Sequence, residues 1–202
     1  MNKNLDTAAA KTKLYNLLAH ALNYPDMDLV SSLVEGRFRL DLMAVLPPEV
    51  RAAIEGLLIY NGGEKEIVLL DLERDYTWMF FASKPRIAYL FGSIYSEHKL
   101  YQDSTIEIAR LYHEAGLKVE EAFKLPPDHI AIELEFMSYL AFNEMEAIKA
   151  ANGESEEYAI ELQQKALEKY VGPLARSIGE RIVIGAKTDF YRTMGHILTA
   201  IF

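Results

Sequence analysis

The chain has 202 residues, half of them hydrophobic and a quarter charged, and it contains no cysteine. Its formal net charge of −9 argues against a general nucleic-acid binder, because such proteins carry a basic surface. The lack of cysteine excludes disulfide scaffolds, thiolate metal sites and cysteine nucleophiles. Length and composition fit one globular domain, and we expect a single domain over residues 1–202.

The N-terminal part of the chain predicts helices. Apolar residues recur at helical spacing in residues 12–24, in residues 28–35, after Pro47-Pro48 and in residues 64–81. Pro25 ends the first of these, since a residue before proline avoids the helical region. Residues 1–13 lack the apolar stretch of a secretory signal, and no apolar run is long enough for a membrane span.

Residues 82–102 are the least regular part of the sequence. They include Pro85 and Gly92, and a long irregular segment inside a compact domain is often functional. Aromatic residues are dense here and just before it: Tyr76, Trp78, Phe80, Phe81, Tyr89, Phe91, Tyr95 and Tyr101. Such a cluster suits a peptide-binding groove, although each ring taken alone fits a core position equally well.

The C-terminal part is also predicted to be helical. Ser104 and Glu107 match a capping box, with Gly116 as the residue after that helix. Further helices are expected over residues 127–151, over residues 154–184 with a bend at Gly172-Pro173, where proline removes an internal hydrogen bond, and over residues 187–202. Strand signals are poor, since the β-prone residues 87–95 and 182–184 lack hairpin partners. The sequence therefore predicts an all-α globular bundle of about eight to ten helices.

Pro126-Pro127-Asp128-His129, followed by Glu133, places three ionisable groups at the start of an apolar helix. We expect that helix to begin at Pro127 with Asp128 as its cap, and His129 and Glu133 to share a face. Three interpretations stay open: a metal site, acid–base catalysis by His129, or capping with hydrogen bonds to a nearby loop. The residues alone favour capping, because neither a second ligand pair nor a nucleophile motif accompanies them.

Four segments together resemble the TorD/DmsD/NarJ family of redox-enzyme maturation chaperones. Asp75-Tyr76-Thr77-Trp78-Met79-Phe80 is similar to an acidic-Tyr-x-x-Leu-Phe segment of that family, and Pro85 with Ser93-Ile94-Tyr95 is similar to its Pro…Ser-x-Tyr loop. The helix ending at Gly116 and the stretch from Pro126 to Met137 follow in the same order. The resemblance spans residues 72–143. Trp78 stands where Arg is common in the family, and Gly92 where Glu is usual, which leaves the subgroup and the client open.

The resemblance implies an all-helical, TorD-like cytoplasmic chaperone that is not an enzyme and needs no cofactor or metal. Its partner would be the twin-arginine signal peptide of a molybdenum-cofactor oxidoreductase precursor, held back from export until the cofactor is in place. The resemblance implies that seven residues contact the peptide: Tyr76, Trp78, Phe80, Ser93, Tyr95, Asp128 and His129. Two more are expected on physical grounds. Glu133 supplies a carboxylate for guanidinium groups, and Tyr89 supplies a ring for cation–π contact.

Two other functions remain alternatives at this stage. One is a metal-dependent helical hydrolase centred on Asp128, His129 and Glu133, and the other is a helical subunit of a larger assembly. The oligomeric state is expected to be a monomer or a domain-swapped dimer, with the linker around residues 116–125 as the hinge.

Overall fold

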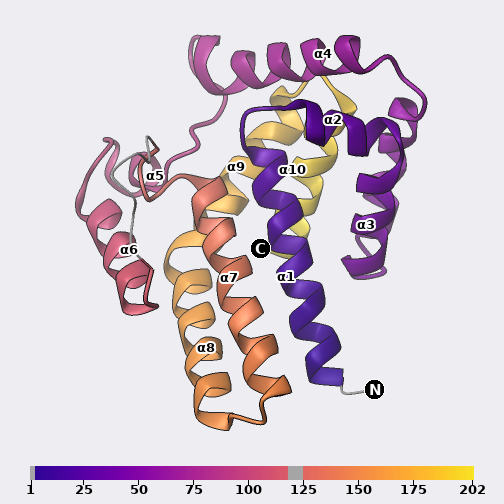
Figure 1. Cartoon of the computed structure of the whole chain (residues 1–202). Coiled ribbons are helices and arrows are strands. Elements are labelled where there is room, and N and C mark those ends of the chain that lie inside the picture. Colours follow the sequence, from indigo (N-terminus) through magenta and orange to yellow (C-terminus); the bar gives the residue numbers. More distant parts are fainter. Residues whose placement is uncertain (1–2, 118–124) are drawn as a thin grey trace. The chain divides into compact units, whose positions relative to one another are not determined.

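The computed structural model describes residues 3–117 and 125–202, which are helical nearly throughout (Figure 1). Within this part of the chain there are ten α-helices and no strand, which confirms the predicted all-α class. The α-helices are α1 (Lys3–Leu22), α2 (Met27–Val34), α3 (Arg37–Val45), α4 (Lys65–Thr77), α5 (Gly92–Glu97), α6 (Asp103–Glu114), α7 (Ile130–Lys149), α8 (Gly153–Ala166), α9 (Gly172–Gly185) and α10 (Asp189–Ile201). A 3-10 helix, η1 (Arg51–Tyr60), and two π-helical turns, η2 (Trp78–Ala82) and η3 (Leu167–Val171), complete them.

The chain divides into two compact units. The first unit combines Met1–Ala19 with Phe91–Leu174, and the second combines His20–Leu90 with Ala175–Phe202. The single domain over residues 1–202 stays a prediction. Most of the linker expected to permit domain swapping, residues 118–124, lies outside the described residues.

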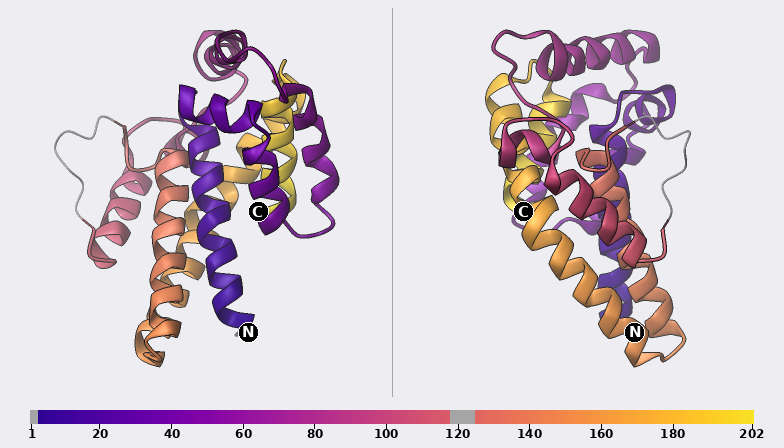
Figure 2. Two further views of the ribbon diagram at one scale, coloured as in Figure 1. Left: turned by 45° about the vertical axis from the view of Figure 1, so that its right-hand side comes forward. Right: turned by 90° about the vertical axis from the view of Figure 1, so that its left-hand side faces the viewer.

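The first unit is built on α7 and α8, which run antiparallel beside each other in both orientations of Figure 2. The buried Glu144 of α7 joins three helices, because its carboxylate accepts from Lys11 Nζ of α1 at 3.2 Å and from Gln163 Nε2 of α8 at 2.8 Å. The Ser138 hydroxyl donates to the Thr12 carbonyl at 3.0 Å, which further ties α1 to α7. These polar contacts fix the register of helices whose apolar contacts alone would allow sliding.

In the second unit, α9 and α10 approach each other at two glycines. A Cβ atom on Gly179 would lie 2.9 Å from Leu198 Cβ, and one on Gly195 would lie 2.9 Å from Val183 Cγ2. The absence of side chains at these two positions therefore allows the two backbones to pack closely. The aromatic side chains of α10, Phe190 and Tyr191, are fully buried. The Tyr191 ring meets those of Tyr76 (α4) and Phe80 (η2), and the Phe190 ring meets that of Phe38 (α3).

Several predicted boundaries are confirmed. Gly116 follows α6 with φ of 84°, and the Leu117 N–H donates to the Tyr112 carbonyl, as expected for a glycine that closes a helix. The helix predicted over residues 154–184 runs as α8, η3 and α9 without a gap, and its hydrogen-bond ladder is interrupted before Pro173, where the Gly172 N–H reaches the Leu167 carbonyl five residues back. Proline has no N–H to continue the regular ladder, and the wider turn of η3 precedes it.

Other local predictions are wrong because side chains form hydrogen bonds or ion pairs with residues of other segments instead of with their own helix. Ser104 does not form a capping box: its N–H and hydroxyl both donate to the Glu97 carboxylate, while Glu107 pairs with Lys169 at 2.8 Å. The segment after Pro47-Pro48 forms a 3-10 helix rather than an α-helix, and its Ala53 carbonyl accepts from Thr193 of α10. The short helix α3 was not expected from the sequence.

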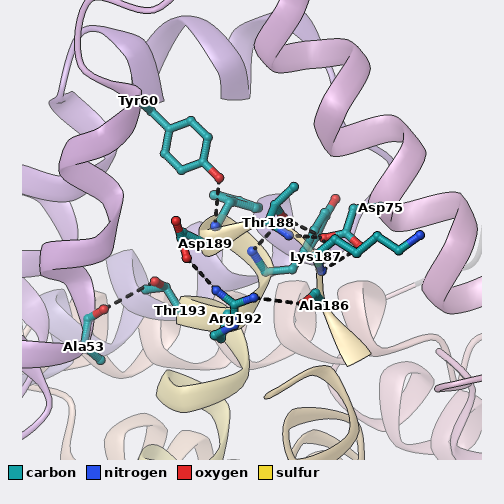
Figure 3. A network of polar contacts seen from close by, with 11 residues as sticks. Ala53, Tyr60, Asp75, Ala186, Lys187, Thr188, Asp189, Arg192 and Thr193 are labelled. Atoms are coloured by element: carbon teal, nitrogen blue, oxygen red, sulfur yellow. Dashed lines mark hydrogen bonds and ion pairs between the residues drawn. The ribbon is translucent and has the colours of Figure 1, made fainter. Parts of the chain in front are cut away.

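Asp75, at the end of α4, holds the turn between α9 and α10 (Figure 3). Its buried carboxylate accepts from the Lys187 N–H at 3.0 Å, the Thr188 N–H at 2.7 Å and the Thr188 hydroxyl at 2.7 Å. Thr188 is in turn the N-cap of α10. Nearby, the Tyr60 hydroxyl accepts from the Phe190 N–H at 3.0 Å. The start of α10 is therefore fixed by side chains far away in the sequence.

We predict that Asp75→Ala destabilises the protein by about 2–4 kcal/mol, because two half-buried N–H groups lose their acceptor. Urea unfolding followed by circular dichroism measures this. Asp71→Ala is the matched control on the same helix, since Asp71 is exposed and lies 3.9 Å from Arg74, and we expect less than about 0.5 kcal/mol there. Equal losses in the two variants would contradict the role given to Asp75.

Candidate functional site

The Pro126-Pro127-Asp128-His129 stretch of the first unit forms a turn that precedes α7. The His129 N–H donates to the Pro126 carbonyl at 3.0 Å, and the Pro127 carbonyl accepts from the Tyr112 hydroxyl at 2.8 Å. The helix therefore starts at Ile130 and not at Pro127, and the prediction that Asp128 caps it is wrong. His129 is the cap, because its Nδ1 accepts from the Ala131 N–H at 3.2 Å.

Asp128 instead caps a different helix, α5. Its backbone carbonyl accepts from the Gly92 N–H at 2.9 Å, and its carboxylate Oδ2 accepts from the Ser93 N–H at 2.8 Å. Phe91 and His129 form an isolated antiparallel bridge, and their rings meet edge to face with centroids 5.2 Å apart. The carboxylate thus faces the positive end of α5, where free N–H groups gather, and holds residues 91–93 against the start of α7.

Asp128, His129, Glu133 and Ser93 are all buried. Burial lowers the pKa of His129 to about 4, against a smaller opposing effect of the Asp128 charge. The ring is therefore neutral at pH 7, and since Nδ1 accepts a hydrogen bond, its proton lies on Nε2. Burial, and secondarily the Asp128 charge, raise the pKa of Glu133 well above its usual value, which favours the neutral acid over the carboxylate.

Three buried oxygens of this cluster make no hydrogen bond within the part of the chain that the structure describes: Ser93 Oγ, Asp128 Oδ1 and Glu133 Oε2. Gly92 lies beside them, since a Cβ atom there would be 3.5 Å from Glu133 Oε1 and 3.8 Å from Asp128 Cβ. The cluster therefore holds three buried polar oxygens whose hydrogen-bonding capacity is not used by the described residues.

Nowhere in residues 3–117 and 125–202 do three His, Asp or Glu side chains come together in a way that could hold a metal ion. His129 Nδ1 is already engaged by the backbone of its own helix. The hydrolase alternative thus finds no metal centre in those residues.

The other expected peptide-binding residues divide into buried and exposed ones. In the second unit, Tyr76 and Phe80 are core residues with rings 4.8 Å apart at a steep angle, whereas Trp78 is partly exposed and Tyr89 half-buried. In the first unit, Tyr95 is half-buried on α5. The structure brings Ser93, Asp128, His129 and Glu133 together within one unit, and the aromatic residues 76–89 belong to the other.

The sequence analysis missed two cations that lie on these aromatic rings. Lys187 Nζ is 4.1 Å from the centre of the Trp78 ring, and Arg86 Cζ is 4.8 Å from the centre of the Tyr89 ring. Lys187 is distant from Trp78 in the sequence, so no local pattern could have indicated the contact. Arg86 lies three residues before Tyr89 in the irregular segment, where side-chain directions follow no fixed period.

A family model described as nitrate reductase delta subunit matches residues 44–176, more than half of the chain. The chain belongs to this family. It is the TorD/NarJ family to which the sequence segments point, and the match includes the α4–η2 segment, the α5 region and the start of α7.

Individual relatives agree with this assignment. A protein named chaperone protein TorD from Shewanella sp. (strain ANA-3) is 25% identical over 151 residues, which are 71% of this chain and 72% of that protein. A chaperone protein TorD from an Escherichia coli strain is 32% identical over 98 residues, 48% of this chain and 46% of that protein.

A crystal structure from Archaeoglobus fulgidus, described as a candidate redox enzyme maturation protein, has a TM-score of 0.56 and 20% sequence identity to this chain. The comparison covers 94% of this chain and 92% of that one. At this identity the likeness shows a shared fold. No helix among the described residues is both long and apolar enough to cross a membrane.

We predict that Asp128→Ala frees residues 91–97. Hydrogen–deuterium exchange at the Ser93 amide should become about tenfold faster or more, because its acceptor is lost. Asp128→Asn, which keeps one side-chain oxygen as an acceptor, should show a smaller increase. Unchanged exchange in Asp128→Ala would contradict the contact.

We predict that Glu133→Gln is tolerated and changes the pH dependence of stability. The native state holds a proton on Glu133 that the unfolded chain releases above its usual pKa of 4.5, so this group loses stabilising effect as pH rises above that value. Gln cannot ionise. The stability of the variant relative to the original chain should therefore grow as the pH rises above 4.5.

Urea unfolding at several pH values measures this difference. The opposing effect of His129, whose lowered pKa costs stability as pH falls from 6.5 towards 4, is present in both proteins and cancels. Glu157→Gln on the exposed face of α8 is the control. A difference between Glu133→Gln and the original chain that stays constant with pH would show that Glu133 is ionised in the fold.

Proposed function

We propose that this protein is a cytoplasmic, system-specific chaperone that binds the twin-arginine signal peptide of a molybdenum-cofactor oxidoreductase subunit and assists its maturation before export. Membership of the TorD/NarJ family supports this, together with relatives that are themselves named chaperones. The observation that carries the proposal is that hydrogen bonds to Asp128 fix the start of α5. Buried Asp128 holds residues 91–93 in one conformation at the point where the chain is otherwise irregular.

We propose two roles for the expected residues of the first unit. The buried ones position the site: Ser93, Asp128, His129 and Glu133. The half-buried ring of Tyr95 contacts the apolar stretch of the peptide. For the four aromatic residues of the second unit, Tyr76, Trp78, Phe80 and Tyr89, peptide contact stays a prediction. A preorganised surface loses little conformational entropy when it binds, which favours a short extended peptide.

The acidic character of the chain supports the choice of a basic partner. A net charge of −9 attracts a peptide with two guanidinium groups and speeds its encounter, with an effect that weakens in salt. No nucleophile or metal chemistry is needed for this role, which agrees with relatives that are named chaperones and not enzymes.

Calorimetry with twin-arginine leader peptides tests the proposal. We expect micromolar or tighter binding, lost when both arginines of the peptide are changed to lysine, because lysine lacks the bidentate geometry of the guanidinium. Tyr95→Ala should weaken binding about tenfold. Phe142→Ala, an exposed ring on α7 outside the nine residues, should leave it unchanged.

A pull-down from cells completes the test. A molybdoenzyme precursor should be captured with its leader and lost when the leader is deleted. If no leader peptide binds and no precursor is captured, the proposed function fails.

A further inference from the structure

The second unit has exposed aromatic rings that are in cation–π contact with basic side chains. Trp78 is 39% exposed and Phe81 52% exposed. Lys187 Nζ lies 4.1 Å from the centre of the Trp78 ring, and Arg86 Cζ lies 4.8 Å from the Tyr89 ring centre and 5.9 Å from that of Phe81. We call these five residues the aromatic–cation surface.

Among residues 3–117 and 125–202, the two cations of this surface have no carboxylate partner. In the part of the chain that the structure describes, neither Arg86 nor Lys187 makes an ion pair, whereas other cations of the same unit do. Lys65, for example, lies 3.0 Å from Glu35. Two positive charges without counter-charges are unexpected in a chain with a net charge of −9, where carboxylates outnumber cations.

Hydrogen bonds of backbone N–H groups fix the two segments that carry these cations. The turn that carries Lys187 is fixed by the Asp75 carboxylate, as Figure 3 shows. The loop that carries Arg86 is fixed at both ends, since the Ile87 N–H donates to Ser83 Oγ at 3.0 Å and the Ala88 N–H donates to the Met79 carbonyl at 3.3 Å.

The two supports also touch each other. Gly185, just before the Lys187 turn, packs so tightly on Ile87 that a Cβ atom would not fit. The segments that carry Lys187 and Arg86 are therefore packed against each other, which places both cations in one region of the second unit.

The chemistry of this surface selects its ligand. Guanidinium and ammonium groups pair with carboxylates, and the rings next to them supply apolar contact area, a combination that is common at the energetic centre of protein interfaces. A second arginine or lysine approaching the Trp78 ring would meet Lys187, a charge of the same sign. A carboxylate would be attracted by both cations, and it would not have to displace another carboxylate of the described residues from either of them.

We propose that the aromatic–cation surface binds an extended peptide segment of a partner protein in which carboxylates stand next to apolar side chains. The carboxylates pair with Arg86 and Lys187, and the apolar side chains cover Trp78 and Phe81. This binding is independent of the twin-arginine peptide, whose recognition we assign chiefly to the region around α5. Two cations match a short segment with a few carboxylates, whereas a nucleic acid carries a negative charge at every nucleotide and meets more repulsion from the acidic remainder of the chain.

Trp78 is the only tryptophan of the chain, so its fluorescence reports on this surface alone. The probe is a tryptophan-free peptide of about ten residues in which Glu alternates with Leu or Phe. A second peptide has Gln at every Glu position, a third has Lys there, and a short oligothymidine is the fourth probe. Each is titrated at low salt while the Trp78 emission is recorded.

We expect a saturable change in Trp78 emission with the Glu peptide and little with the other three. Lys187→Gln and Arg86→Gln should each weaken the binding of the Glu peptide about five- to tenfold. The control Lys65→Gln removes the same charge from the opposite end of α4 and should change the affinity less than about twofold. Circular dichroism confirms that each variant is folded.

Three results would overturn the proposal. One is no saturable change with the Glu peptide, and another is an equal loss in Lys65→Gln, which would indicate attraction to net charge only. The third is tighter binding of the Lys peptide or of the oligothymidine. None of these depends on whether a twin-arginine leader binds in the calorimetric test.

Discussion

The contact between the Asp128 carboxylate and the Ser93 N–H is the interaction on which the candidate site depends. It joins an irregular segment to the start of the longest helix of the first unit, and the Gly92 N–H and the Phe91–His129 bridge strengthen the same junction. A buried carboxylate that accepts backbone N–H groups is costly to remove, because the donors are left without water or protein partners. The conformation of residues 91–95 therefore follows from Asp128.

The second unit uses the same device. Asp75 is buried at the end of one helix and accepts two backbone N–H groups just before another, α10. Both aspartates lie in segments that resemble family motifs, and Asp128 was expected to contact the peptide. In the structure Asp128 fixes the start of α5, which carries Tyr95, and Asp75 fixes the turn that carries Lys187.

Charge is distributed unevenly over this acidic protein. The buried cluster around Glu133 avoids a second negative charge by keeping its proton, whereas Arg86 and Lys187 keep their charges beside aromatic rings without a carboxylate partner among the described residues. A single chain can thus attract a basic peptide through its overall field and still offer a local site for carboxylates. The two proposals describe different parts of the molecule and can succeed or fail separately.

The sequence by itself determined the all-α class, most helix positions, the closing glycine at Gly116 and the interruption before Pro173, because these follow from apolar period and from backbone limits of Gly and Pro. It also singled out the segments around Asp75 and Asp128. Only the tertiary structure decided which N–H groups those carboxylates accept, why α7 starts at Ile130, and that Lys187 lies on Trp78. Such contacts join residues distant in the chain, and their partners are set by packing that no local pattern encodes.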